Sequence, residues 1–427
     1  MEEELTPSIA TTIPIPSPPK KRLKTTNASE DSEPYHHQAL LPGLPDHIAQ
    51  LILSQVHRPT TLSSVCRSWR RLLYSPSFPP FLSLYALVLP HNHQSHSQFH
   101  HYPLQILALD PLSSSSSSGS GSDSDTPKPN WEPLPPPPNP PLRPVLRHPS
   151  FLSRNLPIQS VSVSGKLVLL AATAENLVPA LQRPVVFDPV LRRWGFGPPI
   201  GTPRRWCAGG ASAGAVFVAS GIGSHYAPDV ARSVEKWDLG TQSQSFVRHR
   251  STNGRSWKWE KLEPMKDAKF SREAIDAVGW RGKLCMVNVK GGSAKQGVIY
   301  DAAADDWSEM PEGMISGWRG PAAAMDEKTL YAVDEAKGVL RKYDAVADGW
   351  EEVVAEGRLV GAEQMAAGGG RVCVVSGGGG GIAVVDVVAS PARVCGVVDV
   401  PVGFRAVAVH VLPRMSRPDW DGTGSGF

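Results

Sequence analysis

The same short pattern occurs three times in this 427-residue chain: an aromatic residue, an aspartate, five further residues and a tryptophan. The copies are Phe187-Asp188…Trp194, Tyr300-Asp301…Trp307 and Tyr343-Asp344…Trp350. Trp237-Asp238…Trp259 and Leu109-Asp110…Trp131 are looser copies, stretched by polar insertions. From Asp188 onward the aspartates recur about every 40–60 residues, the period of propeller-type repeats. The chain is therefore an array of like units, and such arrays typically bind other molecules and seldom catalyse.

Short apolar runs bounded by Gly, Pro, Asn and Asp extend from Leu84 to Leu412. Many short strands with intervening turns predict an all-β region, and the repeat favours a propeller over a sandwich or a barrel. An aspartate directly after a strand can accept hydrogen bonds from the N–H groups of a turn. Tryptophan is large enough to fill the gap between two neighbouring sheets.

The pattern counts six units. The sixth has Val385-Asp386 but lacks the tryptophan, and Val397 stands near the place where it would fall. The first unit lacks an opening strand, whereas the run Phe404–Leu412 is a strand without a unit of its own. We therefore predict a six-bladed β-propeller whose C-terminal strand completes the first blade, because this closure leaves no long exposed sheet edge.

Residues 39–82 have a helical pattern instead. Leu44-Pro45-Asp46 suits the start of a helix, and Ile48, Leu51, Ile52 and Val56 follow at helical spacing. Thr60 or Thr61 can cap a second helix, which carries Leu62, Val65, Cys66, Trp69, Leu72 and Leu73 on one side. Two short amphipathic helices cannot bury their apolar faces alone, so we expect them to pack on each other and on a partner protein.

The remaining segments are poor in apolar residues. Residues 1–38 are predicted to be a disordered arm, residues 113–141 a disordered insert within the propeller segment 83–413, and residues 414–427 a tail. The basic cluster Pro18–Lys24 in the arm can be a nuclear import signal or a solvated run of charge. We expect the protein in the nucleus, the cytoplasm or both.

Composition excludes several classes of protein. The net charge of +3 argues against a general nucleic-acid or membrane-surface binder. The five cysteines are scattered without a CxxC pair, which indicates reduced thiols in an intracellular protein rather than disulfides or a zinc site. No stretch approaches the ~18 apolar residues of a membrane span, and the acidic, proline-rich N-terminus is not a signal peptide.

The sequence contains no catalytic constellation, and we expect neither enzymatic activity nor a cofactor or metal. The histidines between His91 and His101 are irregularly spaced in a polar tract, which is typical of a solvated loop; adventitious metal binding is the alternative. The run Gly377–Gly381 lacks the Lys-Ser/Thr of a phosphate-binding loop, so we interpret it as a flexible connection between strands.

Residues 40–82 resemble an F-box, with the pattern Leu-Pro-x-x-Ile…Leu…Val-Cys-x-x-Trp-Arg-x-Leu, and the repeats resemble kelch repeats. An F-box followed directly by kelch repeats is similar to the plant F-box/kelch-repeat proteins, and within them to the group that interacts with the Skp-type adaptor. The resemblance implies a substrate-recognition subunit of an SCF-type cullin–RING ubiquitin ligase. The F-box would bind the Skp-type adaptor, and the propeller would hold a protein target for ubiquitination and proteasomal degradation.

The resemblance also suggests which residues face the adaptor. Carried over by position, the candidates are Leu44, Pro45, Ile48, Leu51, Ile52, Leu62, Val65, Cys66, Trp69 and Leu72. Some of them must instead pack the two helices against each other.

Several units carry an arginine just before the expected innermost strand: Arg154, Arg205, Arg272, Arg319 and Arg405. In a propeller these positions converge at one mouth of the central channel, where guanidiniums would suit an acidic or phosphorylated segment of a target. The alternative is that each arginine bonds the carbonyls of neighbouring loops. We expect the loops Gly221–Arg232 and Gly291–Gln296 near this mouth and the insert Thr241–Ser256 on the opposite rim.

Two other functions compete with this interpretation. One is a kelch interaction scaffold outside the ubiquitin system, against which the F-box helices count. The other is a copper oxidase of the kind housed by some kelch-like propellers, which needs a Tyr/His/Cys ligand set that we cannot assemble from the sequence.

Overall fold

The computed structural model describes residues 39–54, 62, 65, 66, 68, 69, 82–90, 104–109, 130–137, 158–174, 178–239, 258–272, 275–288 and 296–415. The predicted arm, the basic cluster, the histidine-rich tract, the tail beyond Met415, and residues 113–129 and 138–141 of the predicted insert lie outside these residues. The predicted disordered insert is too long, because residues 130–137 are described and Trp131–Pro133 forms a strand that pairs with residues 107–109. No helix in the described part of the chain is long and apolar enough to cross a membrane.

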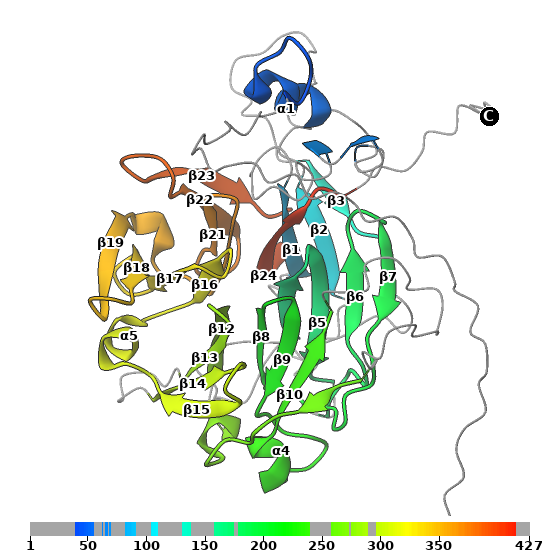
Figure 1. Cartoon of the computed structure of the whole chain (residues 1–427), viewed down its shortest axis with the longest axis vertical. Coiled ribbons are helices and arrows are strands. Elements are labelled where there is room, and N and C mark those ends of the chain that lie inside the picture. Colours follow the sequence, from blue (N-terminus) through cyan, green and yellow to red (C-terminus); the bar gives the residue numbers. More distant parts are fainter. Residues whose placement is uncertain are drawn as a thin grey trace, which may run out of the picture. The chain divides into compact units, whose positions relative to one another are not determined.

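Six four-stranded antiparallel sheets are arranged around a common centre (Figure 1). We number them as blades I to VI and give the strands of each from the innermost outward. Blade I contains β24 (Phe404–Pro413), β1 (Leu82–Pro90), β2 (Gln105–Leu109) and β3 (Trp131–Pro133). Blade II contains β4 (Ile158–Val163), β5 (Lys166–Ala172), β6 (Val185–Asp188) and β7 (Arg193–Phe196). Blade III contains β8 (Ala208–Ser212), β9 (Ala215–Ala219), β10 (Val234–Asp238) and β11 (Glu260–Lys261).

The second half of the ring repeats the same order. Blade IV contains β12 (Ile275–Trp280), β13 (Lys283–Asn288), β14 (Gly297–Asp301) and β15 (Asp306–Glu309). Blade V contains β16 (Ala322–Met325), β17 (Thr329–Asp334), β18 (Val339–Asp344) and β19 (Gly349–Ala355). Blade VI contains β20 (Gln364–Gly368), β21 (Arg371–Val375), β22 (Gly381–Asp386) and β23 (Arg393–Asp399).

The C-terminal strand closes the ring, as the sequence predicts. Strand β24 is the innermost strand of blade I and pairs with β1 from Leu82↔Pro413 to Pro90↔Phe404. The N-terminal and C-terminal ends of the propeller therefore share one sheet. Every pair of neighbouring blades, including blades VI and I, buries its own apolar cluster. The predicted six-bladed propeller is confirmed.

The signature aspartates stabilise turns. Asp301 accepts a hydrogen bond from the backbone N–H of Ala303 at 3.0 Å, and Asp344 accepts one from Val346 at 2.8 Å. Asp301 also lies 2.9 Å from the Nζ of Lys283, which begins the second strand of the same blade. This lysine, together with the turn N–H groups, lowers the pKa of the Asp301 carboxyl. The aspartate thus fixes the turn and joins two strands at once.

The signature tryptophans join neighbouring blades. Each donates its indole N–H to a backbone carbonyl at or just after the last strand of the preceding blade. The pairs run around the ring: Trp131 with Asp399, Trp194 with Pro135, Trp259 with Pro198, Trp307 with Glu263, and Trp350 with Gly313. One residue type therefore supplies both the bulk that fills the gap between sheets and a directional bond across it.

Blade VI differs because it has no tryptophan. The residue that pairs with Val385 is Val394, so the expectation that Val397 takes this place is wrong. The turn sets this pairing: six residues separate Asp386 from its partner Arg393, whereas four separate Asp301 from Asp306, and the β-bulge between Val384 and Val385 lies beyond the pair. Leu359, in the short helix η3 (Gly357–Leu359), is fully buried in the same apolar cluster as Val394 and fills the gap from the other side.

The antiparallel strands give the propeller two different faces. The connection face carries the segments that join consecutive blades, such as 197–207, 310–321 and 356–363, and the loops between second and third strands. It includes the short helices α4 (Pro228–Arg232), η2 (Lys269–Arg272) and α5 (Glu312–Gly317). The turn face carries the tight turns, and there the chain enters the propeller at Leu82.

The predicted F-box segment contains one described helix, α1 (Asp46–Ser54). Leu53 of this helix packs with Leu62, and Leu40, Leu41 and Trp69 lie against the pair. Leu62, Val65, Ser68 and Trp69 have helical backbone, but the rest of the second predicted helix lies outside the described residues.

Candidate functional site

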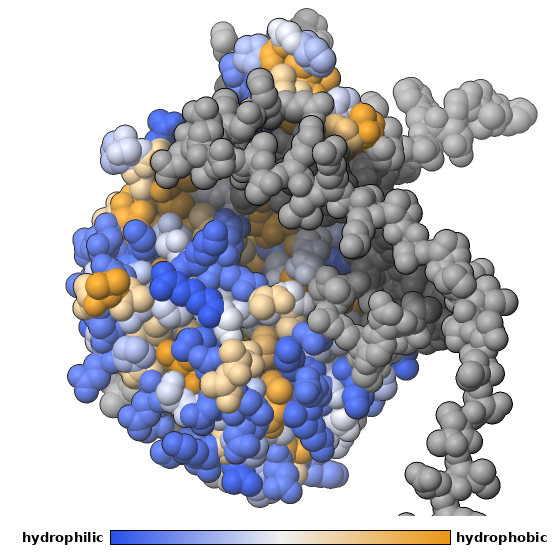
Figure 2. Space-filling model, viewed as in Figure 1, coloured by the Kyte–Doolittle hydropathy of each residue, from blue (hydrophilic) through white to orange (hydrophobic). Residues whose placement is uncertain are grey.

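The exposed apolar residues of α1 form the first candidate site. Ala49 and Leu53 point into the small core, whereas Leu51 and Ile52 are about half exposed, at 51% and 49%. Leu44, Pro45 and Ile48 are also exposed, as is Val65 of the second helical segment. Figure 2 shows hydrophobic residues at the surface over this helix, at the top of the view. We call Leu44, Pro45, Ile48, Leu51, Ile52 and Val65 the helical apolar surface.

The other predicted adaptor residues have different surroundings. Leu62 is buried beneath α1. Trp69 is half-buried and donates its indole N–H to the carbonyl of Leu40 at 2.8 Å, so it ties the second helical segment to the residues before α1. Cys66 is half-buried, with its Sγ 3.2 Å from the hydroxyl of Ser68. Leu72 lies outside the described residues.

The predicted arginines belong to the connection face. Arg205 and Arg319 lie in segments between blades, and Arg405 is the second residue of β24. Arg319 is exposed and donates its Nε–H to the carbonyl of Ser316 at 3.2 Å. It therefore bonds a nearby backbone carbonyl, which is the alternative to target binding. Arg154 lies outside the described residues, as does the side chain of Arg272, whose backbone ends η2.

Arg205 has a more distinctive environment. Its guanidinium carbon lies 4.4 Å from the centre of the Trp206 ring, in a cation–π stack. Its backbone pairs with Ile222, which brings the segment 197–207 against the loop Gly221–Arg232. Burial lowers the pKa of the Arg205 guanidinium, and its Nε is buried without a hydrogen-bond partner. Among the described residues, no side chain forms an ion pair with it.

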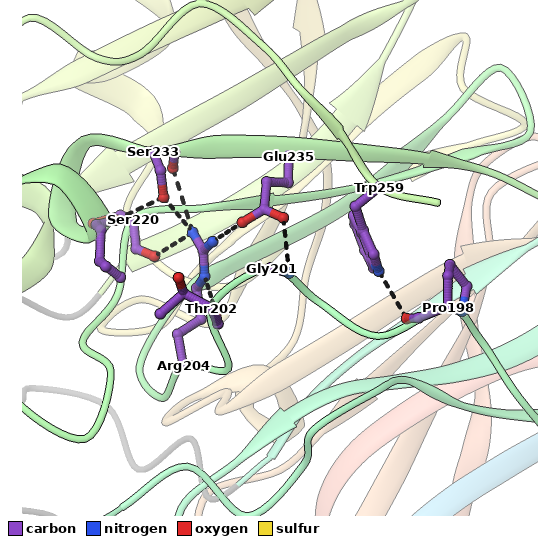
Figure 3. Close-up of polar contacts among 9 residues, drawn as sticks. Pro198, Gly201, Thr202, Arg204, Ser220, Ser233, Glu235 and Trp259 are labelled. Atoms are coloured by element: carbon purple, nitrogen blue, oxygen red, sulfur yellow. Dashed lines mark hydrogen bonds and ion pairs between the residues drawn. The ribbon is translucent and has the colours of Figure 1, made fainter. Parts of the chain in front are cut away.

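The residue before it, Arg204, points inward instead (Figure 3). Arg204 is only 1% exposed and forms an ion pair with Glu235 of β10. Its other N–H groups bond the carbonyls of Thr202 and Ser220, each at 3.2 Å, and the hydroxyl of Ser233 at 2.8 Å. Glu235 in turn accepts the N–H of Gly201 at 3.3 Å. We call these residues the Arg204 network.

The sequence did not indicate the Arg204 network. Two adjacent arginines look alike in a sequence, and nothing in it says that the first turns inward and the second outward. The only signal was Glu235, which stands next to Val234 in a strand that also contains Lys236 and Asp238, so its burial and its need for a partner could not be inferred from the sequence.

The predicted recognition loops are only partly described. The loop Gly221–Arg232 ends in α4 and exposes His225 and Tyr226 on the connection face. Of Gly291–Gln296 only Gln296 is described, and Thr241–Ser256 lies outside the described residues. The face in view in Figure 2 is mostly hydrophilic, with hydrophobic residues in small separate groups.

A channel of about 200 Å³ runs between the innermost strands, lined by residues of all six blades. Alanine and glycine make up nearly half of its lining, and its polar groups include Ser160, Asp276, Gln364 and His410. A Cβ on Gly279 would lie 1.8 Å from the carbonyl oxygen of Ala211, so glycine is required where the inner strands approach most closely. No group of three or more His, Cys, Asp or Glu side chains in the described part of the chain could hold a metal ion.

His410 links the closing strand to blade II inside this channel. Its Nε2 and Nδ1 lie 2.9 Å from the hydroxyls of Ser160 and Ser162. Burial lowers the pKa of the imidazole to about 4, because the charged form loses its hydration. His410 therefore joins blades I and II in its neutral form.

We expect His410 to make the propeller sensitive to mild acid. The unfolded state takes up a proton near pH 6.5, the folded state only near pH 4, so stability is full above pH 6.5 and falls as the pH drops between these values. His410 should contribute a loss of about 2 kcal/mol between pH 7 and pH 5. Urea denaturation of His410→Gln at both pH values should show a smaller loss than wild type, whereas the exposed His225→Gln should behave as wild type. Equal losses in all three proteins would contradict the role of His410.

Comparison with known proteins agrees with this architecture. No family model matches the chain. It is 49% identical over 410 residues to the F-box/kelch-repeat protein SKIP25 of Arabidopsis thaliana, which covers 95% of both chains. It is 23% identical over 303 residues to the F-box/kelch-repeat protein SKIP4 of the same plant, covering 70% of this chain and 71% of the other. With a helical segment before a closed six-bladed propeller and this degree of identity, the chain belongs to the plant F-box/kelch-repeat proteins.

Proposed function

We propose that this protein is the substrate-recognition subunit of an SCF-type cullin–RING ubiquitin ligase. In this role the F-box binds a Skp-type adaptor, and the propeller holds a protein target for ubiquitination and proteasomal degradation. The protein acts by binding and not by catalysis. Its place of action is the nucleus, the cytoplasm or both, in keeping with five cysteines of which none forms a disulfide.

The observation that carries the proposal is the helical apolar surface. Leu51, Ile52 and Val65 are each about half exposed or more, although they belong to helices whose core is already formed by Leu53 and Leu62. Exposing several large aliphatic side chains close together in the sequence is unfavourable for a monomer, and such patches mark protein–protein interaction sites. An adaptor that covers this surface would bury it.

The connection face of the propeller is the proposed site for the target. Its loops vary in length and sequence on a rigid frame of six sheets, which is where recognition usually resides. Arg205, Arg319 and Arg405 belong to this face, and Arg154 and Arg272 remain candidates by position. A kelch scaffold outside the ubiquitin system would use the same face. Binding to the Skp-type adaptor is therefore what distinguishes the two functions.

Proximity labelling in plant cells with the proteasome inhibited tests the function. Wild type should label the adaptor, the cullin and a set of ubiquitinated targets. Leu44→Ala/Pro45→Ala should label the same targets, but without the adaptor and without their ubiquitin conjugates, because both changes lie on the helical apolar surface. Retention of the adaptor by the variant, or unchanged ubiquitination of the shared targets, would contradict the proposed function.

A further inference from the structure

A buried ion pair joins the segment before blade III to strand β10 of that blade. Arg204 and Glu235 are 1% and 3% exposed, and together they hold four stretches of chain in place: Gly201–Thr202, Ser220, Ser233 and strand β10. A buried ion pair is a poor way to gain stability, since the desolvation of both charges offsets their attraction. The Arg204 network is better explained as a means of fixing these segments in one arrangement.

The segments that it fixes are strained. Trp206 has φ = +53° and Ser220 has φ = +60°, in the left-handed region that bulky residues rarely adopt. They flank the bridge between Arg205 and Ile222, and Gly221 at φ = +95° completes it, where a Cβ would lie 2.8 Å from the carbonyl oxygen of Arg205. Such conformations persist only where the surroundings enforce them, and they are concentrated at binding sites.

What this strained bridge presents is the Arg205–Trp206 stack. The indole holds the guanidinium plane from one side, 4.4 Å from its carbon atom. The Nε of Arg205 has no hydrogen-bond partner, and among the described residues the side chain has no carboxylate partner either. A guanidinium that is held in place without a carboxylate partner can bind the oxygens of a carboxylate or phosphate through its terminal N–H groups.

We propose that the Arg205–Trp206 stack is a preformed anion-recognition site for carboxylate or phosphoryl groups of the target, and that Arg204 and Glu235 are its positioning residues. That the ligand belongs to a target protein rests on the proposed function; the anion site itself does not. The exposed His225 and Tyr226 of the neighbouring loop offer further contacts. The site makes Arg205, and not every arginine of the connection face, the main determinant of specificity.

The chain offers a matched control on the other side of the propeller. Arg281 stacks on Trp280 at 4.8 Å, so it repeats the cation–π pair, although here the arginine and not the tryptophan has a positive φ, of +50°. It lies in a tight turn of the turn face, however, and donates its Nε–H to the carbonyl of Lys328 at 3.3 Å. A stack of arginine and tryptophan without the Arg204 network should not bind the target.

The test is binding of the purified full chain to peptide arrays, in three arms with phosphoserine, glutamate or serine at a fixed position between random residues. Wild type should bind the phosphoserine or the glutamate arm, and the preferred arm identifies the anion. Arg205→Ala should weaken that binding at least about tenfold and reduce its dependence on salt. Arg281→Ala should match wild type in both respects.

Arg204→Lys tests the positioning role, because lysine keeps the charge opposite Glu235 but cannot make the several bonds of a guanidinium. It should weaken binding several-fold without changing the salt dependence, since Arg205 remains the contacting cation. Arg204→Met/Glu235→Leu removes both charges together. It should also weaken binding several-fold with unchanged salt dependence, while its melting temperature stays close to that of wild type.

Three results would overturn the proposal. They are equal binding of wild type to all three arms, wild-type affinity of Arg205→Ala, or a loss of affinity by Arg281→Ala as large as that of Arg205→Ala. Full binding by both Arg204 variants would overturn the positioning role. None of these results depends on the adaptor, so they are distinct from a failure of the proposed ligase function, which would appear as loss of adaptor binding by the wild type.

Discussion

Ile48→Asp/Ile52→Asp is expected to reduce affinity for a Skp-type adaptor at least about 100-fold, without unfolding the protein. Both residues are exposed, at 36% and 49%, and they lie one helical turn apart on α1. Burying two aspartates in an apolar interface leaves two charges without partners. Truncating or desolvating a central interface residue typically costs about 2 kcal/mol or more, so the pair would cost about 1,000-fold if the effects add, and about 100-fold is the lower bound. Calorimetric titration with purified adaptor measures the effect.

The control for this variant is His47→Asp/Gln50→Asp, which adds the same two carboxylates to the same helix outside the helical apolar surface. Its affinity for the adaptor should lie within a few-fold of the wild-type affinity. Both doubles should keep the wild-type melting temperature, because neither touches the core residues Ala49, Leu53 and Leu62. If the two doubles lose affinity equally, charge on α1 and not its apolar surface is responsible, and the proposed contact surface is incorrect.

Trp307→Ala is expected to destabilise the propeller by about 3–5 kcal/mol, a large share of a typical total of about 5–15 kcal/mol. The indole is buried between blades III and IV, 5.2 Å from the ring of Tyr300, and it donates to Glu263 at 2.9 Å. Its removal creates a cavity and leaves a carbonyl without its donor. Urea denaturation of the full chain, followed by circular dichroism, measures the loss.

Two comparisons separate the contributions. Trp307→Phe keeps most of the apolar volume but removes the N–H, so it should cost about 1–2 kcal/mol. Val346→Ala, in a turn where the side chain is almost fully exposed, should change stability by less than about 0.5 kcal/mol. If Trp307→Ala costs no more than Val346→Ala, the tryptophans do not hold the blades together.

The parts of the fold that could be predicted from the sequence are those that repeat. Asp301 and Asp344 follow strands at the same spacing, and each stabilises its turn through bonds to N–H groups within three residues. Trp307 and Trp350 recur because every blade must be joined to the preceding one. Local and periodic interactions of this kind leave a signal in the sequence. The run Phe404–Leu412, a strand without a unit of its own, then predicted how the ring closes.

The rest depended on contacts between residues far apart in the sequence. The longer turn between Asp386 and Arg393 places Val394 and not Val397 opposite Val385, and Leu359 compensates from a different segment. Arg204 and Glu235 are 31 residues apart, with β8, β9 and the loop between β9 and β10 lying between them in the sequence. Likewise, spacing placed ten apolar residues on two helices, but only packing separates the buried Leu62 from the exposed Leu51 and Ile52.

The central claim is that this chain is the receptor subunit of a cullin–RING ligase. The most direct measurement is mass photometry of the purified full chain mixed with a plant Skp-type adaptor and a cullin. The account predicts a single 1:1:1 complex that forms only when the adaptor is present, and that Ile48→Asp/Ile52→Asp does not enter. A wild-type chain that remains separate from a formed adaptor–cullin complex would contradict it.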